Sequence, residues 1–170
     1  MTTDTDTAPS LRGPTSADAA GVHALVEASG VLDVNSVYAY LLVCTDFART
    51  SVVADRDGEV VGFVAGYCPP GRDDVVFVWQ VGVAASARRQ GLGQKLLDAL
   101  LEQPGCESVR WLETTITPSN LASQKLFASF ARRQEAGLEK GPGFSAAELG
   151  SAGHEEEERY RIGPLEKRKQ

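Results

Sequence analysis

The sequence predicts one α/β (α+β) domain in which a mixed β-sheet is flanked by helices. Strand-like and helix-like segments alternate along the chain without internal repeats or low-complexity stretches. An apolar segment at residues 75–83 leads into a turn rich in arginine and glycine, and a leucine-rich helical pattern follows it. The 170 residues are 42% hydrophobic, which suffices for one buried core and leaves no room for a second domain. We expect this domain to span residues 11–165, between a disordered tail at residues 1–10 and a charged tail at residues 166–170.

The N-terminal segments predict a short strand and two helices. Leu11 and Arg12 start the strand. Thr15 and Asp18 have the spacing of a capping box, which predicts a helix that continues to about residue 29. A second helix is expected over residues 36–44. The first helix should bury a stripe formed by Val22, Leu25 and Val26.

A hairpin and a loop are expected next. Residues 51–55 and 60–67 are rich in strand-forming side chains, and Asp57-Gly58 between them is a strong turn signal. Residues 68–74 contain two prolines and a glycine, which do not fit into a strand ladder. This segment is therefore expected to be a loop.

The second half of the chain predicts three more strands and two helices. Residues 75–83 are rich in Val, Phe and Trp, as is typical of a buried strand. Further strands are expected near residues 109–114 and 159–162, and a helix from about residue 119 to residue 130. Residues 135–153 are rich in glycine and contain a proline, which indicates a long irregular loop. The helix after the arginine- and glycine-rich turn should bury Leu92, Leu96, Leu97, Leu100 and Leu101.

Charge and cysteine content exclude several classes of partner. The net charge of −6 argues against nucleic acid, since that partner requires clustered Lys and Arg, and the basic tail is too short to supply them. No apolar run approaches the roughly 20 residues of a membrane span, and the N-terminus lacks a signal-peptide pattern. Cys44, Cys68 and Cys106 lie far apart, so neither a zinc site nor a disulfide framework is expected. These features predict a cytoplasmic protein with free thiols, no bound metal and no membrane partner.

The turn that follows residue 83 has the features of a phosphate-binding loop. Successive main-chain N–H groups in such a turn point at one volume, and the helix that follows adds partial positive charge. Gly91 and Gly93 would let a pyrophosphate approach where a Cβ would collide, and Arg88 and Arg89 supply mobile positive charge. The alternatives are a glycine-rich connector without a ligand and a Rossmann fingerprint. The Gly-x-Gly-x-x-Gly spacing of the latter is absent.

The pattern Arg88-x-x-Gly91-x-Gly93 resembles the acetyl-CoA pyrophosphate loop of the GNAT superfamily of N-acetyltransferases. The order of elements also matches the GNAT fold, which implies a central mixed, mostly antiparallel sheet that is splayed where acetyl-CoA enters. The resemblance implies that the amides of Val81 and Val83 meet the pantetheine and that one of them polarises the thioester carbonyl. It implies that acetyl-CoA is bound by Val81, Val83, Arg88, Arg89, Gln90, Gly91, Leu92, Gly93, Gln94, Asn120 and Phe127.

A closer resemblance covers most of residues 33–162. The runs Phe77-Val-Trp-Gln-Val81 and Leu112-Glu-Thr-Thr-Ile-Thr-Pro-Ser-Asn120 are similar to the L-2,4-diaminobutyrate acetyltransferases of ectoine biosynthesis. The implied reaction moves the acetyl group of acetyl-CoA to the 4-amino group of L-2,4-diaminobutyrate. The product would be cyclised by ectoine synthase to a compatible solute used under osmotic stress. The resemblance also implies a homodimer, and it extends to residues 33–44, 50–54, 62–70 and 154–162.

The acceptor amine determines what chemistry the site needs. An alkylammonium has a pKa of about 10.4, so the nucleophile must lose a proton before it attacks a thioester. Carboxylates would hold the two ammonium groups of the substrate, and a water or a side chain would remove the reacting proton. By resemblance, the catalytic and substrate-binding candidates are Asp33, Tyr38, Trp79, Glu113, Thr115, His154 and Glu157.

Several candidates have a purely structural alternative. Asp33 is also placed to be only the N-cap of the following helix, and a strand tryptophan such as Trp79 is often a core side chain. His154 could be a bystander. The glutamates at residues 155–158 could form a solvated face, and alternation alone does not tell which of them points inward. The family pattern His-x-x-Glu selects Glu157.

Two other functions are compatible with the sequence. One is a GNAT acetyltransferase for another small diamine, amino acid or protein N-terminus, and Trp79 and His154-x-x-Glu157 argue against it. The other is a CoA-binding module without turnover, which would need the loop but none of the carboxylates.

Many GNAT enzymes have a tyrosine at the position of Phe127, and that tyrosine protonates the departing thiolate. Phe127 has no proton to give, so the residue that acts as the acid is not identified here. A thiol has a pKa of only about 8.5, and its thiolate can leave unprotonated.

Overall fold

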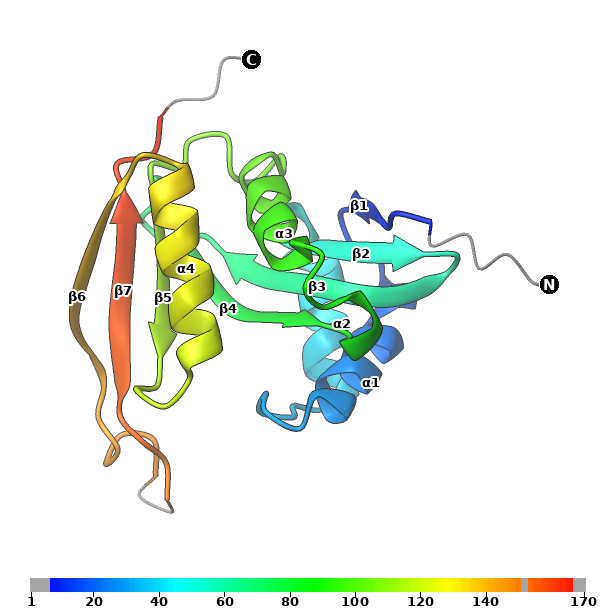
Figure 1. The fold of residues 1–170 in the computed structure, drawn as a ribbon, viewed down its shortest axis with the longest axis horizontal. Helices are drawn as coiled ribbons and strands as arrows, with labels where there is room; N and C mark the ends of the chain where they lie inside the picture. The colour runs from blue at the N-terminus through cyan, green and yellow to red at the C-terminus, as the bar shows by residue number, and fades with distance from the viewer. Residues whose placement is uncertain (1–6, 151–152, 167–170) are drawn as a thin grey trace. The chain divides into compact units, whose positions relative to one another are not determined.

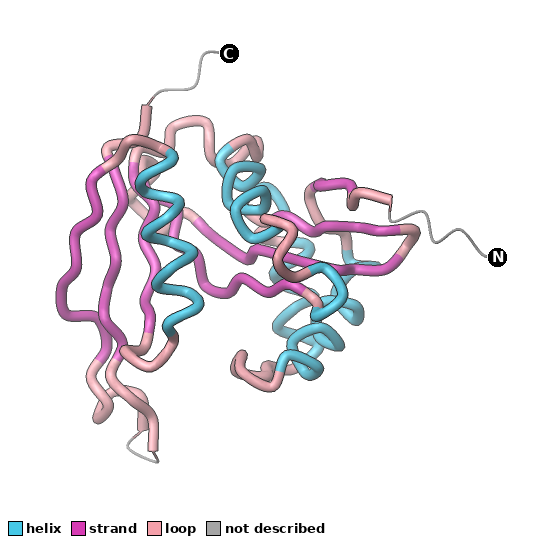
Figure 2. The backbone as a smooth tube through the Cα atoms, viewed as in Figure 1, coloured by secondary structure: helices cyan, strands magenta, loops and turns pink. Residues whose placement is uncertain are grey.

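The described part of the chain forms a mixed sheet and four α-helices. Their arrangement is shown in Figures 1 and 2. The computed structural model describes residues 7–150 and 153–166. The strands are β1 (Ser10–Arg12), β2 (Val52–Arg56), β3 (Glu59–Tyr67), β4 (Val75–Val83), β5 (Trp111–Ile116), β6 (Gly137–Phe144) and β7 (Glu157–Gly163). The helices are α1 (Ala19–Ser29), α2 (Val37–Thr45), α3 (Leu92–Leu101) and α4 (Leu121–Arg133), with 3₁₀ turns η1 (Ser16–Asp18), η2 (Ala48–Thr50) and η3 (Ala85–Ala87).

The sheet is mixed and mostly antiparallel, as the sequence predicts. Its strand order is β1-β2-β3-β4-β5-β7-β6. The β1–β2, β2–β3, β5–β7 and β6–β7 pairs are antiparallel, whereas β4 and β5 are parallel. The parallel register joins residues 75–78 of β4 to residues 111–114 of β5, and β4 continues beyond it to Val83.

The chain divides into two compact units, and the first contains residues up to 65 together with residues 80–104. Neighbouring residues of its strand β3 face opposite sides of the sheet. On one side Phe63 packs into the core formed with α1 and α2, which includes Val26 and Tyr40. On the other side α3 lies so close to Gly62 that a Cβ there would be 3.1 Å from Leu92 and 3.2 Å from Leu96. In Figure 1, α3 lies on the opposite side of β2 and β3 from α1.

The second unit contains residues 66–79 and the chain from residue 105 onward. Its strands have one apolar and one polar face. The apolar face is buried, and α4, which packs against β6, buries Phe127, Phe130 and Ala131. The polar face carries Glu113, Thr115, Arg159 and Arg161, while the apolar face carries Leu112, Thr114, Ile116, Tyr160 and Ile162.

Most of the predicted elements are confirmed, with boundaries that differ by a few residues. Strand β4 has the predicted bounds, and the turn between β2 and β3 has positive φ at Asp57 and Gly58, as a tight hairpin requires. The buried stripe of α1 and the buried leucines of α3 are also confirmed. Ser10, predicted to end a mobile tail, instead starts β1. The predicted tail residues 1–6 and 167–170 lie outside the described residues.

The prediction of an irregular loop over residues 135–153 was wrong, because β6 occupies residues 137–144. Its glycines and Pro142 have low strand propensity. The strand nevertheless pairs with β7 from Gly137 opposite Gly163 to Phe144 opposite Glu157. It is also the last strand of the sheet, and an edge strand tolerates a proline that has no N–H to donate. Pairing with β7 therefore overrides local propensity.

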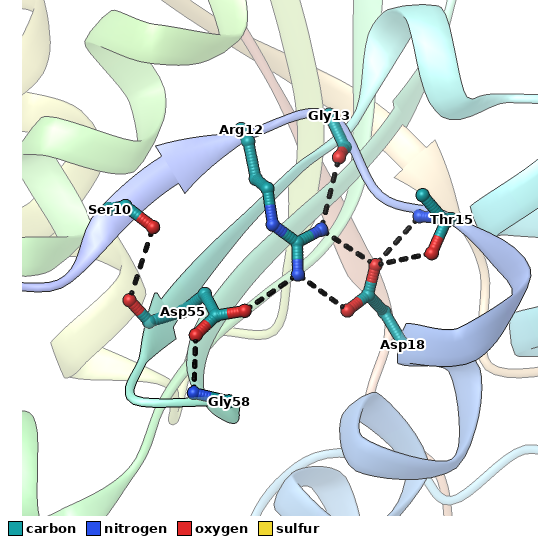
Figure 3. A network of polar contacts seen from close by, with 7 residues as sticks. All are labelled: Ser10, Arg12, Gly13, Thr15, Asp18, Asp55 and Gly58. Atoms are coloured by element: carbon teal, nitrogen blue, oxygen red, sulfur yellow. Dashed lines mark hydrogen bonds and ion pairs between the residues drawn. The ribbon is translucent and has the colours of Figure 1, made fainter.

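Arg12 of β1 joins three segments of the first unit (Figure 3). Its guanidinium donates hydrogen bonds to both carboxylate oxygens of Asp18, at 2.8 and 2.9 Å, and to Asp55 at 2.7 Å. Asp18 closes the predicted capping box by accepting the backbone N–H of Thr15, and Asp55 accepts that of Gly58. The hydrogen bonds from Arg12 are the main cause that lowers the pKa of both carboxyl groups.

An Arg12→Gln variant is expected to be less stable than the wild type above about pH 4. Because the two carboxyl pKa values are lower in the folded chain than their unfolded value of about 3.9, this stabilisation is present above about pH 4 and is lost as the pH falls through the lowered values. We expect a loss of only about 2–4 °C in Tm, because solvent screens the ion pairs of the half-exposed Arg12. Melting curves by circular dichroism should show the difference shrinking below about pH 4. Arg49→Gln, at an exposed arginine of the same unit, is the control, and a loss that is independent of pH would contradict this account.

Candidate active site

The loop between β4 and α3 combines left-handed backbone with the start of a helix. Arg89 and Gly91 have φ angles of 62° and 71°, and Gly91 is the N-cap of α3. Left-handed residues at alternate positions turn successive amides toward one side, as in an anion-binding nest, and the first N–H groups of a helix have no partner within it. A left-handed residue with a Cβ, such as Arg89, is uncommon, and such backbone concentrates at ligand sites. The geometry fits the predicted phosphate loop.

The side chains of this loop leave open space next to the backbone of Gly91. A Cβ on Gly91 would meet no heavy atom within 4 Å. The exposed Arg88 folds back so that its Nε donates to the carbonyl of Val83 at 3.3 Å, and the exposed Gln90 donates to the carbonyl of Ser86 at 3.5 Å. The half-buried Val81 and Val83 end β4 just before the loop, and Leu92, Gly93 and Gln94 form the first turn of α3.

Asp33 lies before α2 but does not cap it. The N-cap is Ser36, whose hydroxyl oxygen accepts the N–H of Ala39 at 3.2 Å. The alternative that Asp33 is only a helix cap is therefore wrong. The hydrogen bonds found at Asp33 use its backbone carbonyl, which accepts from Asn35 and Gln80. Among the residues that the structure describes, none forms a hydrogen bond or an ion pair with the exposed Asp33 carboxylate. The carboxylate is therefore available to a cationic ligand.

Gln80 and Tyr40 hold the segment that carries Asp33. The Gln80 amide donates to the carbonyl of Asp33 at 2.9 Å, and the Tyr40 hydroxyl donates to the Gln80 amide oxygen at 2.9 Å. Both side chains are buried. Sequence analysis missed this pair. The available signal was a glutamine within an apolar strand, since a buried amide needs hydrogen-bond partners.

Tyr38 is the other acceptor-side candidate in the first unit. It lies in the first turn of α2, and 69% of it is exposed. Val34, Val37 and Leu41 around it in the sequence are also exposed, so this part of the unit presents an apolar surface together with the Tyr38 hydroxyl.

In the second unit, the polar face of the sheet brings the remaining strand candidates together. Glu113 and Thr115 of β5 lie opposite Arg161 and Arg159 of β7, and directly opposed residues share a face. Glu157 lies two residues before Arg159 on β7, so it belongs to the same face.

Trp79 also belongs to this polar face. Phe77 of β4 lies beside Glu113 in the parallel register, and Trp79 follows it by two residues. Trp79 is 40% exposed, whereas its neighbours Val78 and Gln80 are buried. The alternative that Trp79 is only a core side chain is therefore wrong.

Glu113 is buried, with 1% exposed, and pairs with three arginines. Its Oε2 accepts from Arg72 at 2.6 Å and from Arg159 at 3.1 Å, and its Oε1 lies 3.5 Å from Arg161. The candidate Glu113 is thus the centre of an ion-pair cluster. Sequence analysis missed the three arginines, because Arg72 lies in a loop and only the strand register brings the others to Glu113.

The glutamates at residues 155–158 differ in where they lie relative to β7. His154, Glu155 and Glu156 are exposed and precede the strand, and the Ser119 hydroxyl donates to the Glu155 carboxylate. Glu158 lies on the face opposite to Glu157. Strand alternation, once the register is known, therefore singles out Glu157 as the glutamate of β7 on the polar face.

The two cofactor candidates of α4 have structural roles in the second unit. The Asn120 side chain is the N-cap and accepts the N–H of Ser123 at 3.1 Å. Phe127 is 2% exposed and belongs to the core. A contact of either with acetyl-CoA stays a prediction.

Within residues 7–150 and 153–166, no three His, Cys, Asp or Glu side chains gather in a way that could hold a metal ion. None of the helices in the described part of the chain has the length and apolar content to cross a membrane.

Known proteins are similar to this chain in sequence and in fold. The profile of the Acetyltransferase (GNAT) family matches residues 24–131. Over 154 residues, the chain is 48% identical to an L-2,4-diaminobutyric acid acetyltransferase of Marinococcus halophilus, covering 91% of this chain and 89% of that protein. The chain belongs to the diaminobutyrate acetyltransferases of the GNAT family.

Two further relatives agree with this assignment. The L-2,4-diaminobutyric acid acetyltransferase of Streptomyces coelicolor is 47% identical, over 89% of this chain and 91% of that protein. The structure of diaminobutyrate acetyltransferase EctA from Paenibacillus lautus, in complex with its substrate L-2,4-diaminobutyric acid and coenzyme A, has 37% identity and a TM-score of 0.87. It covers 95% of this chain and 98% of that chain. The predicted GNAT fold is thus confirmed.

Proposed function

We propose that this GNAT enzyme transfers the acetyl group of acetyl-CoA to the 4-amino group of L-2,4-diaminobutyrate, giving N4-acetyl-L-2,4-diaminobutyrate. The observation that carries the proposal is similarity over nearly the whole chain to diaminobutyric acid acetyltransferases, one of them solved with that amino acid and coenzyme A.

On the donor side, the pyrophosphate of acetyl-CoA would bind the loop between β4 and α3. The left-handed backbone at Arg89 and Gly91, the open space above Gly91 and the start of α3 all favour a phosphate there. Arg88 is exposed and would add positive charge. The amides of Val81 and Val83 would contact the pantetheine, and one of them would stabilise the oxyanion formed when the amine attacks the thioester.

On the acceptor side, the two ammonium groups of diaminobutyrate need separate acidic partners. The Asp33 carboxylate is available in the first unit, and Glu157 lies on the polar face of the second unit beside Thr115. Tyr38, Trp79 and His154 are exposed and would complete the acceptor site. One acidic group would hold the α-ammonium while the other holds the 4-amino group and assists its deprotonation.

The departing thiolate has no hydroxyl donor at the position of Phe127, which is a buried core residue of α4. Since a thiol has a pKa of about 8.5, coenzyme A can leave as the thiolate and take a proton from water afterwards. The proposal therefore requires no tyrosine acid.

The test is the identity of the product. Incubation with acetyl-CoA and L-2,4-diaminobutyrate should give one acetyl group per molecule by mass spectrometry, and NMR should place it on the 4-amino nitrogen, with little on the 2-amino nitrogen. Separate anchors for the two ammonium groups are the reason for this selectivity. Acetylation mainly at the 2-amino position would contradict the substrate orientation, and turnover of other diamines alone would favour the rival acetyltransferase. Binding of acetyl-CoA without any product would favour a module that only binds CoA.

The biological setting belongs to the same proposal. We place the reaction in the cytoplasm, because Cys44, Cys68 and Cys106 form no disulfide in the described part of the chain, as expected of a reducing compartment. The product would feed ectoine synthesis under osmotic stress. We also propose a homodimer, which light scattering coupled to size-exclusion chromatography would distinguish from a monomer by its mass.

A further inference from the structure

The polar face of the second unit carries more positive charge than its buried glutamate needs. Arg72, Arg159 and Arg161 each carry one positive charge, and Glu113 carries one negative charge, so the four residues together carry +2. Within the described strands, the other acidic residues on this face are the exposed Glu139, opposite Arg161, and Glu157, and neither makes an ion pair with the three arginines. One arginine would suffice to pair Glu113. The side chains of the three arginines are 34–42% exposed, which leaves guanidinium donors accessible to a ligand, and the Nε of Arg72 is buried without a hydrogen-bond partner among the described residues.

The guanidinium groups are held in place from several directions. Glu113 lies beneath them, with its side chain 2% exposed. Arg161 stacks over the Trp111 ring at 4.2 Å, and Arg159 lies 5.9 Å from the centre of the Phe144 ring. A fixed guanidinium loses little conformational freedom when it binds a carboxylate, which it matches with two parallel hydrogen bonds. The cluster is therefore a preorganised site for a carboxylate.

The position of the cluster matches the acceptor side of the proposed reaction. Arg159 lies opposite Thr115 and two residues from Glu157 on the same face. Residues two apart on a strand are separated by about 7 Å, a span comparable to a four-carbon amino acid. Diaminobutyrate carries a carboxylate that Asp33 and Glu157 would repel. A cationic group is needed to bind it.

We infer that Arg72, Arg159 and Arg161, positioned by Glu113, bind the α-carboxylate of the amino-acid substrate and thereby exclude simple diamines. This inference rests on the proposed function. It makes the arginine cluster the part of the site that selects an amino acid over a diamine as the acceptor. Glu113 is then a positioning residue and not a base, because its oxygens are already paired with guanidinium groups.

The experiment compares two acceptors that differ only in the carboxylate, L-2,4-diaminobutyrate and 1,3-diaminopropane. The wild type should acetylate diaminobutyrate with a kcat/KM at least about tenfold higher. Arg72→Met and Arg159→Met should each lower kcat/KM for diaminobutyrate by about tenfold or more, mainly through KM, and leave that for 1,3-diaminopropane unchanged. Arg132→Met, at an exposed arginine in the last turn of α4, is the control and should change neither.

The outcomes separate this inference from the proposed function. Arg72 lies in a loop and Arg159 on β7, so the two variants perturb unrelated backbone. If one of them does not fold, lysine replaces methionine at that position; it keeps the charge beside Glu113 and should still lower the preference for diaminobutyrate, because lysine cannot bind a carboxylate with two parallel hydrogen bonds. An equal loss with both acceptors would indicate a structural role, and unchanged preference in a folded variant would show that the cluster does not bind the carboxylate. Either result overturns the inference and leaves the proposed function standing. A wild type that does not acetylate diaminobutyrate would overturn both.

Discussion

A Gly91→Val variant is expected to lose acetyl-CoA binding, with a Kd for coenzyme A raised by roughly 100-fold or more, equal to about 2.7 kcal/mol. The added side chain would enter the open space above the loop, where the pyrophosphate is expected. The left-handed φ of 71° adds backbone strain, because a β-branched residue is disfavoured there. Calorimetric titration with coenzyme A measures the change.

A matched variant separates the two effects of Gly91→Val, the backbone strain and the steric block of the pyrophosphate. Gly58, in the turn between β2 and β3, also has a positive φ, of 86°, and open space around its Cβ position. Gly58→Val should therefore lose similar stability in thermal melts but keep its affinity for coenzyme A. If a folded Gly91→Val variant bound coenzyme A as the wild type does, the loop would not be the phosphate site.

Replacement of either proposed ammonium anchor is expected to reduce acetyl transfer strongly. Asp33→Asn and Glu157→Gln keep the size of the side chain but remove the charge that holds a substrate ammonium. Each should lower kcat/KM for diaminobutyrate by about tenfold or more, equal to about 1.4 kcal/mol, while the Kd for coenzyme A stays constant. Steady-state kinetics and calorimetry provide the two readouts. The controls are two exposed positions, Asp46→Asn at the C-terminal end of α2 and Glu156→Gln next to Glu157.

The pH dependence of these variants identifies the base. A variant that loses kcat steeply and regains it as the pH rises toward the amine pKa of about 10.4 has lost the group that removes the proton, directly or through water. Two variants that only raise KM would make Asp33 and Glu157 anchors. Full activity in Asp33→Asn would contradict the role that its free carboxylate suggests, and full activity in Glu157→Gln would make that glutamate part of a solvated strand.

Local signals account for the parts of the fold that the sequence predicts well. The capping box of Thr15 and Asp18, the Asp57-Gly58 turn and the loop at Gly91 each depend on residues close together in the chain. The physics that forms them acts within a few residues, and a sequence pattern can express it. The same holds for the leucine stripe of α3 and for the apolar strand β4.

The features that the sequence did not predict depend on contacts between distant segments. Arg72, Arg159 and Arg161 meet at Glu113 through the pairing of β5 with β7 and the position of one loop. The support of Asp33 by Gln80 joins residues 47 positions apart. A glutamine within an apolar strand signals that it needs partners, but no single short window shows which distant residues these are.

The composition that concealed β6 from the sequence analysis also protects the protein from aggregation. A strand at the end of a sheet presents unpaired N–H and C=O groups to any other extended chain. In β6, Pro142 removes one such N–H, the register is irregular between Pro142 and Phe144, and Lys140 adds a charge. At the other end of the strand order, β1 has only three residues. An edge rebuilt from alternating valine and threonine would be easy to recognise as a strand, and it would equally be a template on which neighbouring molecules could extend the sheet.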